Sequence, residues 1–375
     1  MSKTILVYRD RIVPRSEVHF LRRLYIGFDS LKPIWVGRHR DDGIGDLDAE
    51  TRFLGRTGPL GTLDRGLFKH FGVLPPSPDL AKLRPHLVHA HFGRGGALAL
   101  PIARSLGVPL VVTYHGGDAT KDTHYRRRLL PTIYQQRVAA LQHEAALIVC
   151  VSDFIRDRLL ARGFPADKLL VHRYGIEFDE SDAPTAEAPD PYILFAGRFV
   201  EKKGIEFLIH AMGMLEHDGK AVRLELVGDG PIRADLQRQA GTLQQVSFPG
   251  WLPNAVLRAR MRGALAVCVP SVEASGGDAE GLPNVVLEAM ASGAPVVATH
   301  HAGIGEAVED GRTGILVPSG DAAALAAALG RLVDAPDDAR AMGREARRVA
   351  RERFDAMAQS RRLEQLFLDI IAARR

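Results

Sequence analysis

The feature that most constrains the fold of this 375-residue chain is an alternation of short apolar runs with amphipathic segments. The apolar runs predict strands, and the segments between them predict helices. Strands that alternate with helices favour a parallel, doubly wound α/β sheet. In the first half we expect strands at residues 5–8, 33–36, 87–90, 110–114, 147–151 and 169–172, and helices that include 16–24, 96–106 and 153–162.

The alternation stops at residues 179–191, DESDAPTAEAPDP, which are acidic, rich in Pro and Ala and without periodicity. Such a stretch is typical of a linker. The alternation then restarts, and the chain is longer than a single core usually is, so we expect two α/β domains, 1–178 and 192–354. Expected strands of the second are 192–196, 223–227, 264–269, 295–299 and 314–317, and expected helices are 204–215, 232–240, 282–291, 322–332, 339–354 and 361–373.

Charge is divided unequally between the two halves. Residues 1–177 carry 27 Lys and Arg against 17 Asp and Glu, a net charge of +10, whereas residues 178–375 carry 22 against 28, a net charge of −6. A basic half indicates an anionic partner. The basic residues are scattered and form no nucleic-acid-binding module, so we expect no nucleic acid and favour an anionic membrane surface or a lipid diphosphate.

The composition, 46% hydrophobic and 25% charged, is typical of a globular protein. No run of eighteen apolar residues occurs, and the start MSKTILVYRDR is charged too early for a signal peptide. Cys150 and Cys268 lie in apolar segments, which predicts buried thiols rather than a disulfide or a metal site. We therefore expect a cytoplasmic protein whose membrane association, if any, is peripheral on the inner face of the plasma membrane.

Two glutamates, Glu280 and Glu288, stand eight positions apart around a Gly-Leu-Pro turn. Pro283 suits the first turn of a helix and Gly293 is a stop signal, so residues 284–291 predict a helix. Its N-terminus offers N–H groups to a phosphate, while the two carboxylates offer acceptors to sugar hydroxyls. The alternative is a buried helix with two incidental glutamates.

The loop GRFVEKKG, residues 197–204, follows an expected strand of the second half, where open α/β sheets bind ligands. Arg198 offers a rigid fork and Lys203 a mobile point charge, so both suit a diphosphate. Gly204 allows a tight turn or a close approach of backbone to ligand. The alternative is an ordinary basic surface loop.

Two further loops of the second half have glycines after a strand. LVGDGP, with Gly228, resembles a phosphate or ribose loop but is not GxGxxG, and a tight structural turn is the simpler interpretation. In FPGW, the backbone of Pro249 and Gly250 and the ring of Trp251 offer contacts to a nucleobase. Core packing is the alternative for Trp251.

Histidines follow two strands of the first half, in HAHFGRGG and TYHGGDAT. We expect His91 and His115 in neighbouring loops, where each can donate a hydrogen bond to a sugar hydroxyl or a leaving oxygen. Asp118 can accept one or act as a base. We expect His89 to point into packing, and the pair His89-x-His91 lacks the partners of a metal site. Purely structural histidines are the alternative.

Further cations of the first half lie near its first strand and in YRRRLL, residues 125–130. That segment has a basic and an apolar side, which favours either a solvated charged helix or a patch on anionic lipid. Arg9, Arg11 and Arg15 follow the first strand, where they can extend this patch or bind an acceptor phosphate.

Together these motifs resemble the retaining glycosyltransferases of family 4, whose GT-B fold has two Rossmann-like doubly wound domains facing across a cleft. The resemblance covers nearly the whole chain and is strongest at residues 192–320. GRFVEKKG, LVGDGP, PSVEASGGDAEGLPNVVLEAMASGAPVVAT and GRTGILVPSGD occur in order, and RIVPRSE, HAHFG and HGGD are similar to exopolysaccharide (colanic-acid-type) transferases. It implies that residues 355–375 pack back on the first domain as a helix.

The resemblance also implies roles for single residues. Glu280 and Glu288 match the E-x7-E signature, so Glu288 would hold the nucleotide ribose and Glu280 the donor sugar. Arg198 and Lys203 would neutralise the diphosphate, and His115 would contact the donor sugar and stabilise developing charge. Backbone N–H groups near Gly281, Leu282, Pro283 and Asn284 would assist.

The implied reaction moves a hexose with retention from GDP-mannose or a UDP-sugar to a lipid-linked or saccharide acceptor. Such enzymes need no metal and no cofactor, because cations and a helix N-terminus stabilise the leaving diphosphate. The only Asp-x-Asp, Asp46 and Asp48, is interpreted as part of a surface loop. Many relatives carry a Gly-Gly loop after the first strand; YRDRIVPRSE has none, which assigns acceptor contacts to Arg9, Arg15 and Ser16.

Two alternatives stay open. The same fold can act on a small soluble acceptor, and the chain can be an inactive sugar-nucleotide-binding subunit. The second alternative predicts that one or more of Arg198, Lys203, Glu280 and Glu288 is lost, whereas all four are present.

Overall fold

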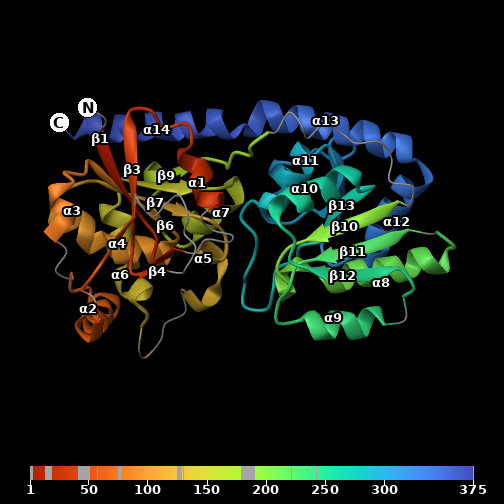
Figure 1. Cartoon of the computed structure of the whole chain (residues 1–375), viewed down its shortest axis with the longest axis horizontal. Coiled ribbons are helices and arrows are strands. Elements are labelled where there is room, and N and C mark those ends of the chain that lie inside the picture. The colour runs from red at the N-terminus through yellow and green to blue at the C-terminus, as the bar shows by residue number, and fades with distance from the viewer. Residues whose placement is uncertain are drawn as a thin grey trace. The chain divides into compact units, whose positions relative to one another are not determined.

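The computed structural model describes residues 3–12, 19–40, 51–56, 58–74, 78–124, 129, 131–178, 191–220, 222–241 and 243–374. The chain forms two compact units. The first unit comprises Met1–Gly175 and Ala356–Arg375, and the second comprises Ile176–Asp355. Each is built on a parallel sheet with helices packed against it (Figure 1), so the predicted α/β architecture with two doubly wound sheets is confirmed.

The sheet of the first unit has seven parallel strands. In chain order they are β1 Lys3–Tyr8, β3 Leu31–Gly37, β5 Thr51–Phe53, β6 Leu87–His91, β7 Leu110–Tyr114, β8 Leu147–Cys150 and β9 Leu169–Val171. Their order across the sheet is β5-β3-β1-β6-β7-β8-β9, so the direction of growth reverses between β1 and β6. In open α/β sheets such a reversal is the point where ligands bind. Two short strands, β2 Arg11–Ile12 and β4 His39–Arg40, pair separately.

Helices on both sides of this sheet begin and end at recognisable signals. In α4, Gly107 closes the C-terminus at φ +64°, a left-handed conformation suited to glycine. In α6, Thr132 and Gln135 form a capping box. The helices are α1 His19–Arg22, α2 Gly58–Phe71, α3 Pro78–Lys82, α4 Gly93–Leu106, α5 Gly117–Thr120, α6 Ile133–Glu144, α7 Asp153–Ala161 and α14 Ala356–Ala373, with 3₁₀ turns that include Arg23–Tyr25.

The final helix, α14, is anchored to the first unit by two polar side chains. One oxygen of Glu364 accepts hydrogen bonds from the backbone N–H groups of Asp29, Ser30 and Leu31, at 2.9, 2.7 and 2.7 Å. The Ser360 hydroxyl accepts from the Gly27 N–H and donates to the Leu24 carbonyl. These bonds fix the helix against the start of β3, because α14 supplies the acceptor for the N–H groups of Asp29, Ser30 and Leu31.

The sheet of the second unit has six parallel strands in the order β12-β11-β10-β13-β14-β15. This order also reverses once, between β10 and β13. The strands are β10 Tyr192–Ala196, β11 Arg223–Val227, β12 Val246–Gly250, β13 Ala266–Val269, β14 Val296–Thr299 and β15 Gly314–Val317. The helices are α8 Ile205–His217, α9 Arg233–Ala240, α10 Asn254–Gly263, α11 Asn284–Ala291, α12 Ala322–Asp334 and α13 Pro336–Phe354, with 3₁₀ turns at Glu201–Lys203 and Ala302–Glu306.

Most predicted strands are confirmed within two residues at each end, because buried parallel strands are continuous apolar runs. The predicted helix 16–24 is only partly described, as α1 and the turn that follows it. Strands β2, β4 and β5 and helices α2, α3, α5, α6 and α10 were not predicted. Cys150 and Cys268 are buried free thiols, as predicted, and burial raises the pKa of Cys150 to about 12.

Several predictions fall outside the described residues. They concern Arg15, Ser16, the Asp46 and Asp48 pair, all of YRRRLL except Leu129, and the linker apart from its last residue. Among the described helices, none combines the length and the apolarity that a membrane crossing requires.

We expect Glu364→Ala to destabilise the first unit. Three backbone N–H groups would lose their acceptor, and one belongs to the buried Leu31; an unsatisfied buried donor costs about 1–3 kcal/mol. The check is urea-induced unfolding followed by circular dichroism. Gln365→Ala, on the exposed side of the same helix, is the control and should change the free energy by less than about 0.5 kcal/mol. Equal unfolding midpoints for the two variants would contradict this account of α14.

Candidate functional site

The reversal of strand order in the second unit brings two polar loops together. Strands β10 and β13 pair directly, with Ile193 opposite Ala266 and Leu194 opposite Val267. The loop 197–204 follows β10 and the loop 270–283 follows β13, so both leave the same edge of the sheet. This edge is where an open α/β sheet binds its ligand.

Four charged side chains meet between these loops. The Lys203 Nζ lies 3.0 Å from the Glu280 Oε1, and the Lys202 Nζ lies 3.6 Å from the same oxygen and 3.3 Å from the Asp278 Oδ1. Glu280 is 12% exposed and the two lysines 19% and 15%. The Glu280 oxygen receives no well-aligned hydrogen bond, so its contact with the lysines is an ion pair.

The local charges decide the protonation of this cluster. Burial alone would raise the pKa of Glu280, but the ammonium groups of Lys203 and Lys202 outweigh it and hold that pKa below its ordinary value. Burial would lower the pKa of Lys202, but Glu280 and Asp278 raise it. Glu280 is therefore a carboxylate and Lys202 an ammonium at neutral pH.

The loop that carries Glu280 is clamped onto the lysine turn. Glu201 accepts hydrogen bonds from the Ser275 N–H at 2.7 Å and the Ser275 hydroxyl at 2.9 Å, and the Val272 N–H donates to the Lys202 carbonyl. Gly204 has φ +60°, and a Cβ there would lie 2.0 Å from the Pro270 carbonyl oxygen. The close approach at Gly204 is thus to protein backbone, and no ligand is needed to explain this glycine.

The loops that carry Arg198 and Gly228 contact each other, but Arg198 is exposed and Gly228 is buried. The Gly197 and Phe199 N–H groups donate to the Val227 and Asp229 carbonyls, which pins the backbone on both sides of Arg198 while its side chain stays exposed. A Cβ at Gly228 would lie 1.8 Å from the Gly197 carbonyl oxygen. The simpler interpretation of LVGDGP, a tight structural turn, accounts for Gly228.

The end of β12 joins this region. The Gly228 N–H donates to the Gly250 carbonyl at 2.9 Å, and Gly250 has φ +79°. Pro249 is exposed, and the Trp251 side chain is 65% exposed. Core packing of Trp251 is therefore excluded, and its ring is available for a stacking contact.

Helix α11 begins at Asn284 and ends at Ala291, as the sequence predicted. Pro283 precedes it, and Gly293 follows at φ +77°, with its N–H bonded to the Met290 carbonyl. The Asn284 and Val285 N–H groups of its first turn have no partner within the helix, whereas the Val286 N–H donates to the Pro283 carbonyl. Glu288 lies half-buried in the middle of this helix, and Gly281 and Leu282 are buried before it.

In the first unit, Asp118 holds the loops after β6 and β7. Its carboxylate accepts hydrogen bonds from the Gly93 N–H at 3.0 Å, the His115 N–H at 3.0 Å and the Gly116 N–H at 2.8 Å. Burial raises the pKa of Asp118, against these three N–H groups, which lower it. Both oxygens accept hydrogen bonds from backbone, so Asp118 positions these two loops, and its role as base or acceptor contact stays a prediction.

Arg9 and His115 both contact the ring of Phe92. The Arg9 guanidinium lies 4.2 Å from the centroid of the Phe92 ring, and the Phe92 and His115 ring centroids are 4.3 Å apart. Phe92 has φ +67°, which costs a non-glycine residue energy and is typical of functional loops. The structure thus brings together two residues that the sequence assigned to the ligand.

The prediction that His91 occupies a loop was wrong. His91 is the last residue of β6 and is fully buried, with Nε2 2.7 Å from the Tyr25 hydroxyl and Nδ1 3.1 Å from the His115 Nε2. His89 is also fully buried, as predicted, and bonds to Tyr25 and Thr113. Burial lowers the pKa of His89 to about 3 and, with help from Arg9, holds that of His115 well below its ordinary value.

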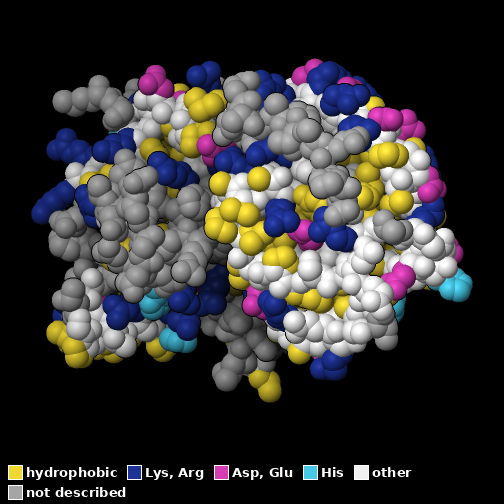
Figure 2. Space-filling view, turned by 45° about the vertical axis from the view of Figure 1, so that its right-hand side comes forward, with side chains coloured by type: hydrophobic (Ala, Val, Ile, Leu, Met, Phe, Trp, Pro, Cys, Tyr) yellow, Lys and Arg dark blue, Asp and Glu magenta, His cyan; other side chains and the backbone are white. Residues whose placement is uncertain are grey.

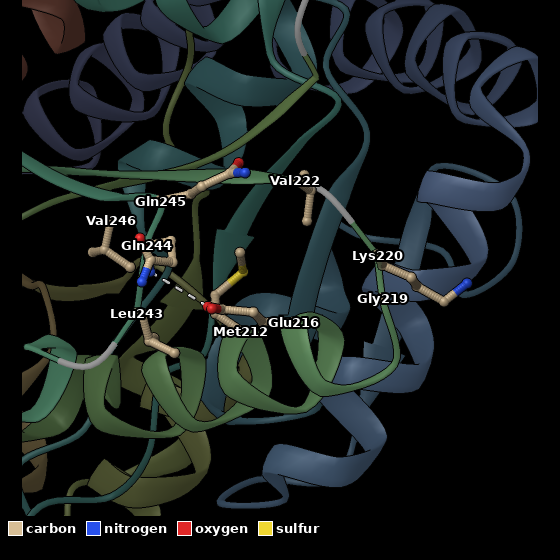
Figure 3. A pocket seen from close by; sticks show the side chains of 9 residues that line it. All are labelled: Met212, Glu216, Gly219, Lys220, Val222, Leu243, Gln244, Gln245 and Val246. Carbon is tan, nitrogen blue, oxygen red and sulfur yellow. Dashed lines mark hydrogen bonds between the residues drawn. The ribbon is translucent and has the colours of Figure 1, made fainter.

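The second unit also has a cavity of about 210 Å³, lined by residues of α8 and of the loops before β11 and β12 (Figure 3). Val222 and Val246 line it where β11 and β12 begin, and the Glu216 carboxylate accepts from the Gln244 N–H across it. It therefore opens at the amino ends of the strands. Lys202, Lys203 and Glu280 lie at the carboxyl ends, so this cavity is not the candidate site.

The sequence matches two family models. A model of the glycosyl transferases group 1 matches residues 190–335, and a model of glycosyltransferase family 4 matches residues 42–180. The GDP-mannose-dependent alpha-(1-6)-phosphatidylinositol monomannoside mannosyltransferase of Mycolicibacterium smegmatis is 30% identical over 78% of this chain and 81% of its own length. The chain belongs to glycosyltransferase family 4.

Relatives of this family 4 chain include exopolysaccharide enzymes. The amylovoran biosynthesis glycosyltransferase AmsK of Erwinia amylovora is 35% identical over 64% of this chain. The chain spans about three fifths of the length of AmsK and of the WcaL proteins of Salmonella typhimurium and Escherichia coli, 59–60%.

Solved structures show the fold of this family 4 chain. Sucrose-phosphate synthase from Thermosynechococcus elongatus matches with a TM-score of 0.77 at 22% identity, covering all of both chains. Anabaena HepE in complex with UDP-glucose matches with a TM-score of 0.74 at 19% identity, covering 99% of each. The GT-B fold expected from the motifs is confirmed.

Some residues of the site were not predicted. Lys202 shares Glu280 with Lys203, and the doubled lysine of GRFVEKKG could have indicated it. Glu201, which clamps the Glu280 loop, lies in the same motif. Tyr25 and Phe92 had no such signal, because their contacts join residues far apart in the sequence.

We expect Glu280→Gln to lower the free energy of unfolding of the second unit by about 1–3 kcal/mol at pH 7, because it removes the shared anion of two mostly buried ammonium groups. The pKa of Glu280 is lowered by folding, so its stabilisation is present above the ordinary value of 4.5 and is lost as the pH falls through the folded value. Denaturant unfolding at several pH values measures it.

The control for Glu280→Gln is Glu352→Gln, since Glu352 forms an exposed ion pair with Arg348. This change should cost less than about 1 kcal/mol. A Glu280→Gln protein as stable as the wild type at pH 7 would contradict the ion-pair account.

Proposed function

We propose that the chain is a retaining, metal-independent hexosyltransferase. It moves a hexose from a nucleoside diphosphate sugar to a lipid-linked or saccharide acceptor, in the synthesis of an exopolysaccharide or another cell-surface glycan. The observation that carries the proposal is the cluster of Lys202, Lys203 and Glu280 at the carboxyl edge of the second sheet, next to the N-terminus of α11.

The proposed division of labour follows from this cluster. Lys203 and the exposed Arg198 neutralise the diphosphate, and the first turn of α11 adds N–H groups. The Oε1 of Glu280 faces the lysines, which leaves its Oε2 to accept a hydrogen bond from a sugar hydroxyl. Glu288 accepts from the ribose hydroxyls, and Trp251 with the backbone of Pro249 and Gly250 meets the nucleobase.

The proposed reaction takes a front-face route. The bond between the anomeric carbon and the phosphate oxygen breaks, the acceptor oxygen bonds to that carbon from the same face, and its proton passes to the departing phosphate oxygen. His115, whose two ring nitrogens bond to His91 and Tyr174, contacts the donor sugar through a ring C–H. No side chain is assigned as a nucleophile, because Glu280 is paired with the lysines and Asp118 binds backbone N–H groups. A glycosyl adduct trapped on either residue would overturn this route.

The relatives suggest two donors to test first. The mycobacterial relative is named as GDP-mannose-dependent, and the HepE structure contains UDP-glucose. We favour GDP-mannose, with UDP-sugars second. The contacts to the nucleobase near Trp251 would discriminate between guanine and uracil.

A thermal-shift screen of GDP, UDP and ADP sugars tests the donor site. One nucleotide class should stabilise the wild type by a free energy of RT ln(1 + [L]/Kd) and so raise its melting temperature. Glu288→Ala should abolish most of that rise. Glu309→Ala, which alters a half-buried glutamate of the same unit, should leave the rise intact. A donor whose stabilisation survives Glu288→Ala would remove Glu288 from the ribose.

Transfer assays separate the alternatives. With the stabilising donor, the main proposal predicts product on a polyprenyl-diphosphate-linked saccharide. In the same assay Lys203→Met should lower kcat/KM by about a hundredfold or more, because the loss of charge stabilisation in the transition state costs several kcal/mol. Product only on small sugars would favour the soluble-acceptor alternative. Donor binding without turnover of any acceptor would favour the inactive subunit.

A lipid-linked acceptor fits an unusual surface on α2. Leu60, Leu63, Leu67 and Phe71 recur every three or four residues, and three of them are exposed, Leu60 at 54%, Leu63 at 55% and Phe71 at 74%. The only acid of the helix, Asp64, is buried. Figure 2 shows hydrophobic side chains beside Lys, Arg and His side chains at the lower left, the corner of the first unit where α2 lies.

We propose that this stripe of α2 rests on an anionic membrane surface, because an exposed apolar stripe with Arg65, Lys69 and His70 on the same helix suits lipid headgroups and acyl chains. The double variant Leu60→Ser/Leu63→Ser should reduce co-sedimentation with phosphatidylglycerol-containing vesicles about tenfold. Leu160→Ser, another exposed leucine of this unit, should not. Equal sedimentation of both variants, or none of the wild type, would contradict the proposal.

A further inference from the structure

Six side chains of the first unit form one continuous chain of hydrogen bonds. The Thr113 hydroxyl lies 2.7 Å from the His89 Nε2, and the His89 Nδ1 lies 2.6 Å from the Tyr25 hydroxyl. The same hydroxyl lies 2.7 Å from the His91 Nε2, and the His91 Nδ1 lies 3.1 Å from the His115 Nε2. The chain ends where the His115 Nδ1 meets the Tyr174 hydroxyl at 2.5 Å.

The number of protons allows this chain only two arrangements. A neutral imidazole carries one N–H and one bare nitrogen, and each hydroxyl carries one proton. Each of the five contacts needs one proton. If Thr113 donates to His89, then His89 must donate through Nδ1 to Tyr25, Tyr25 must donate to His91, and so on to Tyr174. If Thr113 accepts, every bond reverses. All three histidines are therefore Nδ1–H in one arrangement and Nε2–H in the other.

The surroundings favour neutral rings. His89 and His91 are fully buried, beside Trp35 and Phe367, and His115 packs against Phe20 and Phe92. The charged or titratable neighbours are Arg9 on the His91 and His115 side and His172 on the His89 side, and both oppose a positive ring. Among the described residues, no carboxylate contributes to the pKa shift of any of the three rings, so these surroundings oppose an imidazolium.

Both ends of the chain are buried. Thr113 and Tyr174 are each 3% exposed, and within the described part of the chain the Thr113 hydroxyl meets only His89. In either arrangement one terminal hydroxyl proton points out of the chain, at Tyr174 when Thr113 donates and at Thr113 when Tyr174 donates. Burial therefore does not choose between the two arrangements, but both give the three rings the same tautomer.

We propose that Tyr25 is a positioning residue that couples His89, His91 and His115, so that all three rings adopt the same tautomer. Its single hydroxyl proton forces the two rings that share it into opposite roles, one as donor to Tyr25 and the other as acceptor from it. The inference concerns how His115 is held. Its value for sugar transfer rests on the proposed function, but the tautomers themselves do not.

Long-range ¹H–¹⁵N spectra of the full-length protein with ¹⁵N-labelled histidine, without donor, test the proposal. Ring ¹⁵N shifts distinguish protonated from bare nitrogens, and His115→Asn and His91→Gln assign the signals. All three rings should be neutral and in the same tautomer. A mixture of Nδ1–H and Nε2–H forms among the three, or any charged ring, at pH 7 would overturn the proposal, and this wild-type spectrum needs no folded variant.

Tyr25→Phe isolates the coupling. Without the shared hydroxyl, His91 and His115 can exchange donor and acceptor roles, so their ¹⁵N shifts should move toward averaged values. Tyr134→Phe is the matched control: it removes an equally buried hydroxyl, bonded to Tyr114 at 3.0 Å, that lies outside the chain. A Tyr25→Phe protein that keeps the wild-type pattern at both rings would show that Tyr25 does not set the tautomer. A wild-type protein that has the expected tautomers but transfers no sugar would instead count against the proposed function alone.

Discussion

The constraint on which the rest of the structure depends is the single reversal of strand order in each sheet. Where the strand order reverses, the loops after two adjacent strands lead to opposite faces of the sheet. This leaves a crevice at the carboxyl ends of the two strands, and side chains from both loops meet in it. In the second unit this joins the Lys202–Lys203 turn to the Glu280 loop, and in the first it joins Arg9 to Phe92 and His115.

Electrostatics explains how such a site stays ordered before a ligand arrives. Two ammonium groups close together repel each other, and Glu280 offsets that repulsion while Glu201 fixes the loop that carries it. A diphosphate can then take over the cations without a large rearrangement, which is the preorganisation that favours catalysis. The first unit uses neutral groups instead: Asp118 ties two loops through backbone N–H groups, and the histidines share protons in a buried chain.

Local signals made much of this predictable from the sequence. Buried parallel strands are apolar runs, and α11 was predicted to its exact bounds because Pro283 and Gly293 mark its ends. Helix α6 lacks a clear apolar stripe, and α2 turns its stripe outward, so periodicity missed both. The error at His91 has another cause. Its partner, Tyr25, is 66 residues away and is set by the folded arrangement and not by neighbours in the sequence.

The most direct test of the account is a crystal structure of the protein with bound GDP or UDP. The account predicts both phosphates within hydrogen-bond distance of Lys203 and Arg198 and facing the first turn of α11, with Glu288 on the ribose. Phosphates bound elsewhere, for example beside Lys220 at the amino ends of β11 and β12, with the lysine pair still closed on Glu280, would contradict it.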